Sequence, residues 1–524
     1  MSLISRGARL IDRAGRRLMA AAVEIRSWDI DARRYDAAVP TRDWESWVAT
    51  DASANAEIST SHRVLRNRAR DLVRNSPYAA SGLDSWVTNL IGDGITPIFH
   101  STGNAAVDEK RDRLWARWAK QASATDGLSV YGLQALSTRG MIESGESLII
   151  RRRQRPADLE DVPLRLQVVE GDFIDSNRNQ PFDGDSRIVN GVQVDTTGKI
   201  TGYWLFHDHP GNGFGNFWYS QSGMSEFYRR EDVIHLYRAT RPGQVRGVPW
   251  LAPAMIEINQ LRDYEFAEMM RKKAASAFAL VVKGAGLIKQ KAGVGDVLTD
   301  SKGKPYEKVQ PGSIAYAPDG AEITQVNPAQ DQGYPDWMNV RLHAIAAGFG
   351  IPYELLTKNL ERVNFTSIRM GTMDYRRLAS QIRAHVIVQL MLDRIFQWFI
   401  EDAVRYEMLP EADYRVKWPG LKWEELDRAA AAMADLRELR IGVTSITEIC
   451  ARRGTSREQV WRELTDDIQA AKDAGFVFDW DGSLVTANGI AQVWQSDPAA
   501  DPARQDVADK NAETSRTSNL RQVA

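Results

Sequence analysis

The sequence predicts an α+β fold in which a strand-rich region is followed by long helices. Between about residues 140 and 240, short runs rich in Val, Ile and aromatic residues alternate with Gly, Asp and Asn turns, which is typical of a mixed or antiparallel β region. Two patterns with helical spacing, at 251–276 and 334–350, enclose a small glycine- and lysine-bearing unit with strand-like pieces. A third helical pattern, from 367 to about 407, exceeds the usual length of a globular helix.

Composition limits the classes of protein to consider. A chain of 524 residues is several times the usual size of one hydrophobic core, so we expect several domains or lobes. Its 67 basic and 69 acidic side chains nearly cancel, so contact with a polyanion has to come from local patches. The single cysteine, Cys450, excludes an internal disulfide and a cysteine-based metal cluster. Sixteen tryptophans suit a protein with a large packed or subunit-contacting surface.

Neither end of the chain, nor its most apolar stretch, predicts a membrane partner. The stretch 385–400 is interrupted by Gln389, Asp393 and Arg394, so we interpret it as a buried helix. Residues 1–59 combine a basic, helical stretch with an irregular one, and we interpret them as an arm that docks on something acidic rather than as a targeting peptide.

The first helical pattern in the body follows possible caps at Ser59 to Ser61 and reads "HRVLRNRARDLVRNSP". We interpret its five arginines as a solvated face and its apolar residues as the inward face, with a DNA-binding surface as the alternative. The arginines are Arg63, Arg66, Arg68, Arg70 and Arg74, and the apolar residues are Val64, Leu65, Leu72 and Val73.

Two clusters in the strand-rich region invite a metal hypothesis. His207 and His209, in "HDHPGN", lack a third ligand, so a strand end leading into a turn is the preferred interpretation. Glu170, Asp172 and Asp175, in "VVEGDFIDS", could hold Mg²⁺, and a metal-dependent nuclease is therefore an alternative function. Nothing nearby completes a nuclease site, and we expect no catalytic residue, metal or other cofactor.

The two helices around the small unit are bounded by Pro and Gly. The stretch "RPGQVRGVP" forces a non-helical approach, and Pro253 lies in the opening turn of the first helix. The unit at 280–328 contains "SIAYAPDGAEITQV", the clearest hairpin signal in the chain. The stretch "IPYELL" ends the second helix.

A short polar loop, "RVNFTSIRMG" at 362–371, opens the longest helix, which would span ~60 Å. It holds no nucleophile–base pair and no metal-ligand spacing, and Ser367 is a plausible N-cap. Further on, 441–464 resembles a helix-turn-helix, so a transcription factor is a third hypothesis, although two helices joined by a Gly turn is preferred. We expect the polar, aromatic-free residues 496–524 to be disordered.

Three long motifs resemble the lambda-type portal proteins of tailed bacteriophages. They are "VIHLYRATRPGQVRGVPWLAP", the turn "FGIPYELLTKN", and "VNFTSIRMG" opening a long helix, and the likeness extends from about residue 60 to 470. The resemblance implies a ring of about twelve copies at one capsid vertex, a head-tail connector with the DNA channel along its axis.

The resemblance also implies a division of the chain into the parts of a portal fold. After the arm at 1–59 come a β-rich wing at 60–250, a first stem helix at 251–279, a small α/β clip at 280–333 and a second stem helix at 334–350. A tunnel loop at 351–366, a long channel-side helix of the wing at 367–408, a helical crown at 409–495 and the disordered tail at 496–524 complete it.

The tunnel loop offers side chains for sequence-independent contacts to DNA phosphates. The expected DNA-facing residues are Lys358, Asn359, Arg362, Asn364 and Thr366, although some of them can simply shape the turn or cap the helix.

The clip carries lysines that form a docking surface for partner proteins or keep a small domain soluble. These are Lys283, Lys289, Lys291, Lys302 and Lys304. The implied partners are other copies of the chain, double-stranded DNA bound without sequence preference, the terminase large subunit, head-completion or adaptor proteins, and the major capsid or scaffold protein. The implied location is the virion, after assembly in the host bacterial cytoplasm. The resemblance implies no enzymatic activity, because a separate ATPase drives packaging.

Overall fold

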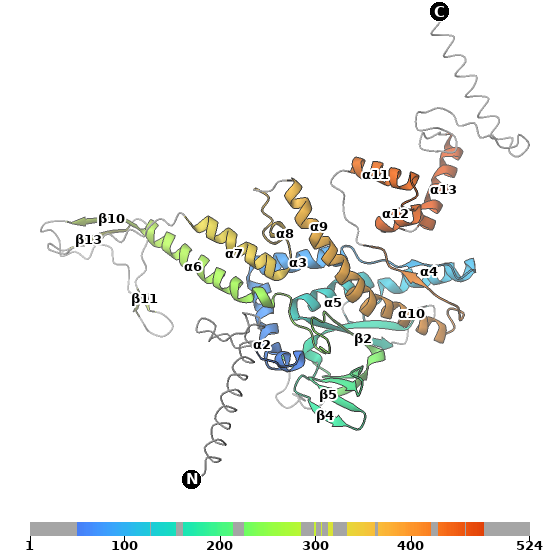
Figure 1. Cartoon of the computed structure of the whole chain (residues 1–524), viewed down its shortest axis with the longest axis horizontal. Coiled ribbons are helices and arrows are strands. Elements are labelled where there is room, and N and C mark those ends of the chain that lie inside the picture. Colours follow the sequence, from blue (N-terminus) through green and yellow to red (C-terminus); the bar gives the residue numbers. More distant parts are fainter. Residues whose placement is uncertain are drawn as a thin grey trace, which may run out of the picture. The chain divides into compact units, whose positions relative to one another are not determined.

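The computed structural model describes residues 50–125, 127–153, 161–212, 225–283, 298–299, 305–306, 313–317, 333–361, 365–420, 428–455 and 457–475 (Figure 1). The chain consists of two compact units, Met1–Glu57 and Ile58–Ala524. Almost all of the described residues belong to the second unit. This unit mixes helices with small sheets, which confirms the predicted α+β class.

The first helices are α2 (Ala54–Asn75), α3 (Pro77–Ile91), α4 (Ala105–Lys120) and α5 (Val130–Ser144). Their boundaries have local causes. Pro77 occupies the first turn of α3, where its missing N–H costs nothing. The side chains of Asn104 and Ser129 cap α4 and α5 by accepting hydrogen bonds from backbone N–H groups of the first turn.

The predicted faces of α2 are wrong at two positions. Val64, expected inward, is 49% exposed, whereas Arg66, expected in solvent, is 4% exposed. The helix turns Arg66 and His62 toward the body because a buried carboxylate, described below, lies there to pair with them. Arg66 is therefore part of the core and not of a DNA-binding face.

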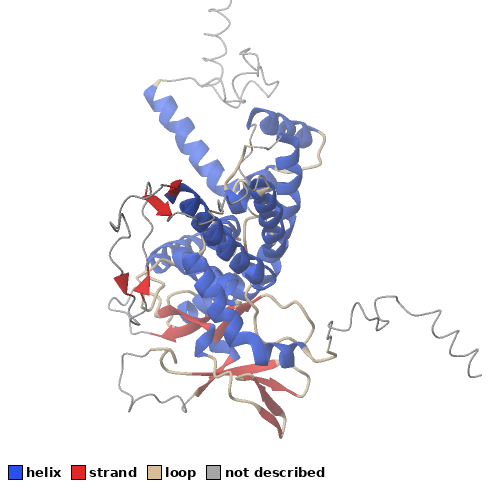
Figure 2. Cartoon of the chain, turned by 90° about the vertical axis from the view of Figure 1, so that its left-hand side faces the viewer, coloured by secondary structure: helices blue, strands red, loops and turns tan. Residues whose placement is uncertain are grey.

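A three-stranded antiparallel sheet has the strand order β3-β2-β9. Most strands of the protein, red in Figure 2, lie below the main group of helices in that view. The three-stranded sheet consists of β2 (Glu146–Arg153), β3 (Leu164–Glu170) and β9 (Val233–Tyr237). The strand β2 is apolar on both faces because both are covered: Ile149 joins the larger core, while Leu148 and Ile150 join a second core. Helix α5 lies against all three strands.

Four tryptophans and the rings near them dominate the larger core. Trp86, Trp118 and Trp398 are at most 2% exposed, and Trp115 packs edge-on against Phe399 with ring centroids 5.0 Å apart. The two-residue strands β1 (Ile98–Phe99) and β14 (Val416–Lys417) pair with each other, and Phe99 and Val416 pack against this core. The pair joins two segments that lie far apart in the sequence.

A second, five-stranded antiparallel sheet packs on the second core. Its strands follow one another in the order of the sequence, as β4 (Gln180–Asp183), β5 (Ser186–Val189), β6 (Val192–Asp195), β7 (Ile200–Leu205) and β8 (Glu226–Arg229). A hairpin turn around 195–199 joins β6 to β7, where the Asp195 carboxylate accepts hydrogen bonds from the backbone N–H groups of Thr197 and Lys199. The antiparallel strand region is thus confirmed.

Helices α6 (Met255–Ala277) and α7 (Tyr334–Phe349) run side by side, as the predicted helices at 251–276 and 334–350 require (Figure 1). The Tyr264 ring packs on Trp337 with centroids 4.1 Å apart, and Arg341 pairs with Glu257 at 2.9 Å. A 3₁₀ turn, Ala252–Ala254, precedes α6 and contains Pro253, as predicted.

The short strands between these helices pair in an unpredicted way. β10 (Phe278–Lys283) pairs in parallel with β13 (Ser313–Ala317), while β11 (Leu298–Thr299) and β12 (Pro305–Tyr306) form an antiparallel pair. β13 is the first half of the predicted hairpin, and its described partner is β10. The second half of that hairpin lies outside the described residues.

The predicted long helix is present and has an irregular middle. It consists of α9 (Phe365–Ile382), a π-helical segment (Arg383–Leu392) and α10 (Asp393–Arg405). Because α9 already begins at Phe365, Ser367 lies inside the helix and is not its N-cap. The buried guanidinium of Arg383 donates to the carbonyls of Leu90 and Pro419, and burial lowers the pKa of Arg383 to about 10.

Three further helices, α11 (Arg428–Arg440), α12 (Ile446–Arg452) and α13 (Arg457–Ala474), form the C-terminal part of the described chain. Gly454, with φ 77°, turns the chain between α12 and α13. The preferred interpretation of 441–464, two helices joined by a Gly turn, therefore holds. None of the described helices combines the length and low charge needed to cross a membrane.

Candidate functional site

The segment that joins α7 to the long helix is held by local caps. Gly350 adopts φ 72° at the end of α7, and its N–H donates back to the carbonyls of Ala346 and Ala347. Pro352 then opens the short helix α8 (Tyr353–Thr357), and Lys358 closes it with φ 58°. Residues 350–361 therefore form an ordered turn, which we call the shelf, and it leads to the polar loop at 362–371.

Helix α3 fastens the shelf to the body. The hydroxyl of Ser85 donates to the Leu355 carbonyl at 3.0 Å, and the ammonium of Lys358 donates to the hydroxyl of Ser85 at 2.9 Å. A groove of about 350 Å³ runs along this junction, lined by Ser81, Asp84, Ser85, Thr88, Asn89, Leu355 and Lys358.

Two of the five predicted DNA-facing side chains lie within the described structure. Lys358 has its ammonium group on α3, although the residue as a whole is exposed. Asn359 shapes the turn, because its side-chain oxygen accepts the N–H of Glu361 at 2.9 Å. Arg362, Asn364 and the side chain of Thr366 lie outside the described residues.

The clip lysines also lie outside it. The backbone of Lys283 ends β10, but its side chain is not described, and neither are Lys289, Lys291, Lys302 and Lys304. The docking surface thus remains a prediction.

Arginines occupy the carboxylate cluster that was the alternative site. Arg70 donates to Asp172 at 2.6 Å and pairs with Glu170 at 2.7 Å, and Arg66 pairs with Asp172 at 2.8 Å. Burial opposes the ionisation of Asp172, but the two guanidinium groups outweigh it and lower the pKa of that carboxyl. The charge that a divalent cation would neutralise is already neutralised.

The third predicted carboxylate points elsewhere. Asp175 accepts from the Ser225 hydroxyl at 2.9 Å, whereas the group with ligand atoms within 4.8 Å of one another comprises Glu170, Asp172 and His209. His209 lies 3.2 Å from Glu170, in the turn after β7, and His207 is not in that group. The trio Glu170, Asp172 and Asp175 proposed for a nuclease is therefore not assembled.

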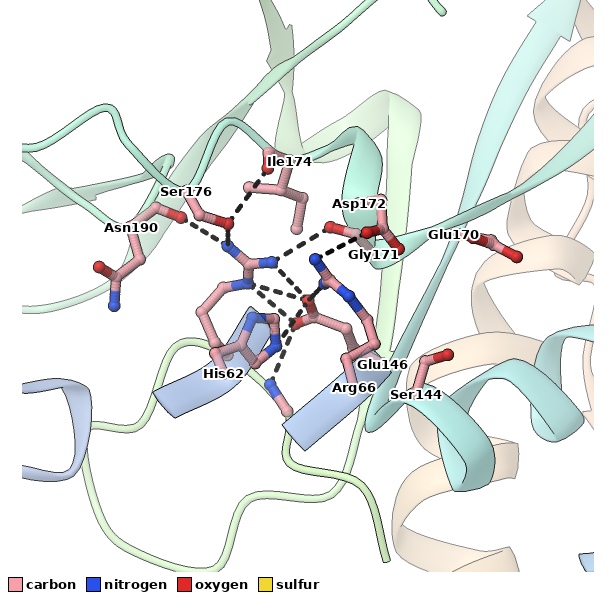
Figure 3. A network of polar contacts seen from close by, with 12 residues as sticks. His62, Arg66, Ser144, Glu146, Glu170, Gly171, Asp172, Ile174, Ser176 and Asn190 are labelled. Atoms are coloured by element: carbon pink, nitrogen blue, oxygen red, sulfur yellow. Dashed lines mark hydrogen bonds and ion pairs between the residues drawn. The ribbon is translucent and has the colours of Figure 1, made fainter. Parts of the chain in front are cut away.

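A buried ion network around Glu146 was missed by sequence reasoning (Figure 3). The Glu146 side chain is fully buried and accepts from Arg246 at 2.9 Å, from the Gly247 N–H at 3.0 Å and from His235 at 3.0 Å. His62 lies 3.3 Å away and Arg66 3.7 Å away. Burial opposes the ionisation of Glu146, yet Arg246 and His62 lead the contacts that hold its pKa well below the usual range.

The same arginine reaches the five-stranded sheet. Arg246 donates to the Ser176 hydroxyl at 2.9 Å and to the carbonyls of Asn190 and Gly171 at 2.8 and 3.1 Å. The network thus joins α2, both sheets and the approach to α6.

Close backbone packing explains Gly247 in "VRGVP" and Gly145, which lies opposite it. A Cβ on Gly247 would lie 2.0 Å from the carbonyl oxygen of Gly145, and a Cβ on Gly145 would lie 2.5 Å from the backbone of Val248. Only glycine allows the two backbones to come this close. The close approach places the neighbouring Arg246 within reach of Glu146, a few residues before α6 begins. We call this buried network the clamp. It consists of Glu146 and the groups that contact it, His62, Arg66, His235, Arg246 and Gly247.

A family model described as "Phage portal protein, lambda family" matches residues 41–383. This chain belongs to the lambda family of phage portal proteins. The clamp, the helix pair α6–α7, the shelf and the start of the long helix all lie within the matched range. A portal occupies a capsid vertex of the phage, so the predicted portal role is confirmed, and the family is a structural one.

Relatives agree over nearly the whole chain. A probable portal protein of Halomonas phage phiHAP-1 is 25% identical over 522 residues, covering 94% of this chain and 97% of the relative. The portal protein of Escherichia phage N15 and portal protein B of Escherichia phage lambda are each 21% identical, covering 82% of this chain and 88% of the relative. Among solved structures, the neck of a native GTA particle with C12 symmetry has a TM-score of 0.37 at 14% identity, covering 74% of this chain and 93% of that chain.

Proposed function

We propose that copies of this portal protein assemble into a twelve-membered ring around a DNA channel, through which the genome is packaged and ejected. Family membership carries this proposal. The exposed apolar side chains on the helix pair support it, because a monomer gains nothing from leaving them in water. Ile256 and Phe266 on α6 are 69% and 60% exposed, and Val340 on α7 is 68% exposed.

In this ring, α6 and α7 are the stem helices, the segment between them is the clip, and 351–366 is the tunnel loop that meets DNA. The shelf gives the loop a fixed base, since Lys358 and Leu355 are both fastened to Ser85. From that base Arg362 would reach phosphates, while Lys358 would add one of its remaining ammonium donors. Repetition around a ring turns weak contacts into a strong non-specific one.

The clip lysines are the proposed docking surface for the terminase during packaging and for head-completion proteins afterwards. The two sheets and α2–α5 form the wing, which would meet capsid or scaffold protein. Assembly takes place in the host bacterial cytoplasm, and the portal itself needs no cofactor.

The ring is tested by mass photometry of the purified protein, followed by class averages in negative-stain electron microscopy. Annular particles of about twelve copies are expected. A monomer or dimer at every salt concentration, even with scaffold protein present, would overturn the proposal.

The loop is tested separately with the double variant Lys358→Ala/Arg362→Ala. Rings should form as in the wild type, while DNA packaging or retention falls, because phosphate contacts are lost and the fold is not. The conservative variant Lys358→Arg/Arg362→Lys keeps the charge and should retain packaging. Failure of the alanine variant to form rings would assign the loop a structural role.

A further inference from the structure

The helices α11–α13, residues 428–475, form a helical unit that is labelled in Figure 1. Its described residues have almost no core of their own. Within its described residues, Cys450 and Ala471 are the two buried apolar residues. Large apolar side chains are instead 37–73% exposed: Met433, Leu436, Ile441, Val443, Ile446, Trp461 and Leu464. An arrangement like this needs a partner that covers it.

Charge is unevenly distributed over the same unit. The stretch of α11 and α12, 428–455, carries five arginines and three carboxylates, a net charge of +2. Helix α13, 457–474, carries three basic and five acidic residues, a net charge of −2. Each part is therefore complementary to the other part of a second copy.

Ion pairs inside the unit leave this complementarity available at particular positions. Arg453 and Arg452 pair with Asp435 at 2.9 and 3.7 Å, which fastens α12 to α11. Arg437 and Arg440 are exposed on α11, and Asp466 and Asp467 are exposed on α13.

We propose that α13 of one copy packs against α11 and α12 of the next copy, so that the apolar side chains of this unit are buried between neighbours in the ring. The inference rests on the proposed ring and names one of its contacts. Two different surfaces meet, which makes the contact heterologous, the type that closes into a ring when it repeats by rotation. Apolar burial supplies the attraction, and the opposite charges set which surfaces meet.

Charge reversal in the full-length protein tests this contact. The variants Asp466→Lys/Asp467→Lys and Arg437→Glu/Arg440→Glu each place like charges at every contact of a homogeneous ring. Each alone should raise the protein concentration needed for ring assembly by about tenfold, more at low salt than at high salt. The variants Asp466→Glu/Asp467→Glu and Arg437→Lys/Arg440→Lys keep the charges and should assemble as the wild type does.

Mixing the two reversed proteins distinguishes a contact between copies from one within a copy. In an alternating ring, the lysines introduced at positions 466 and 467 of one variant would face the glutamates introduced at positions 437 and 440 of the other. The remaining contacts of such a ring would be as in the wild type, so equimolar mixing should restore ring assembly. Mass photometry measures the rings, and hydrogen exchange of 428–475 reports whether the unit is covered.

Three results would overturn the proposal. Rescue only when all four reversals are combined in one chain would place the contact within a single copy. Reversals without effect on assembly or on hydrogen exchange would mean that another part of the chain or another protein covers the unit. A wild-type protein that forms no ring would instead overturn the proposed ring, and this contact with it.

Discussion

The clamp at Glu146 yields a prediction of defined size. In the variant Glu146→Gln the shape of the side chain is kept, but the charge that compensates Arg246 is removed. Arg246 is 1% exposed, so its guanidinium would be left buried beside a neutral amide. Removing one partner of a buried ion pair destabilises a protein by about 3–5 kcal/mol.

The expected shift can be measured by thermal unfolding. For a chain of 524 residues, the usual unfolding entropy per residue makes each kcal/mol lower the melting temperature by about 1 °C, so a fall of about 3–5 °C is expected. The matched control is Glu109→Gln, whose partner Arg113 lies 4.0 Å away and is 72% exposed. Breaking that surface pair should cost less than about 1 kcal/mol.

Two outcomes would refute the reasoning. A melting temperature for Glu146→Gln no lower than that of Glu109→Gln would show that the buried charge is compensated by other groups. Equally, Glu146→Leu/Arg246→Leu should recover part of the loss, since it removes the guanidinium that Glu146 compensates, while Arg66 keeps its pair with Asp172. A double variant less stable than Glu146→Gln would mean that shape and not charge holds the clamp.

Three further predictions concern the same regions. Burial lowers the pKa of His235, so below pH ~6.5 the unfolded chain binds a proton that the folded chain excludes. The melting temperature should therefore fall as the pH drops below that value, and a rise would contradict the prediction. Gly247→Ala places a Cβ 2.0 Å from the Gly145 carbonyl oxygen and should cost at least about 1–3 kcal/mol in urea unfolding; an unchanged midpoint would contradict the close approach. Ser85→Ala removes the hydroxyl that holds Lys358 and should speed hydrogen exchange at 353–361, and equal exchange would show that the shelf does not depend on it.

Local signals explain which parts of the fold were predictable. Pro253 and Gly350 mark helix boundaries by restricting or permitting particular backbone angles, and the helices around 255–277 and 334–349 follow from them. The turn at 195–199 is likewise encoded within a few residues. The strands of the two sheets were predictable too, because runs of Val, Ile and aromatic residues between turn residues are also local signals.

The clamp could not be predicted, because its partners are far apart in the chain. Glu146 looks like an edge residue of an apolar strand, and Arg66 looks like one of several surface arginines on an amphipathic helix. Only the packing of α2 against the sheets brings them within reach of Arg246. Pairing of β10 with β13 escaped prediction similarly, since a local hairpin pattern competed with a distant partner.

The candidate site shows the same division. The position and order of the shelf follow from "FGIPYELLTKN", a local motif. That Lys358 binds Ser85 on α3 is a tertiary contact which no pattern around either residue indicates.

The clamp also has a consequence for the order of folding. Its members lie between residues 62 and 247, so the contacts close only after α2, both sheets and the approach to α6 have come together. Contacts this distant in sequence form slowly, because the entropy of closing a long loop has to be overcome first. We therefore expect the clamp to be among the last contacts to form. A newly made chain without it would lack the Arg246 contacts that join the sheets to the residues before α6, and in the ring proposed above it would meet its neighbours poorly until the clamp had closed.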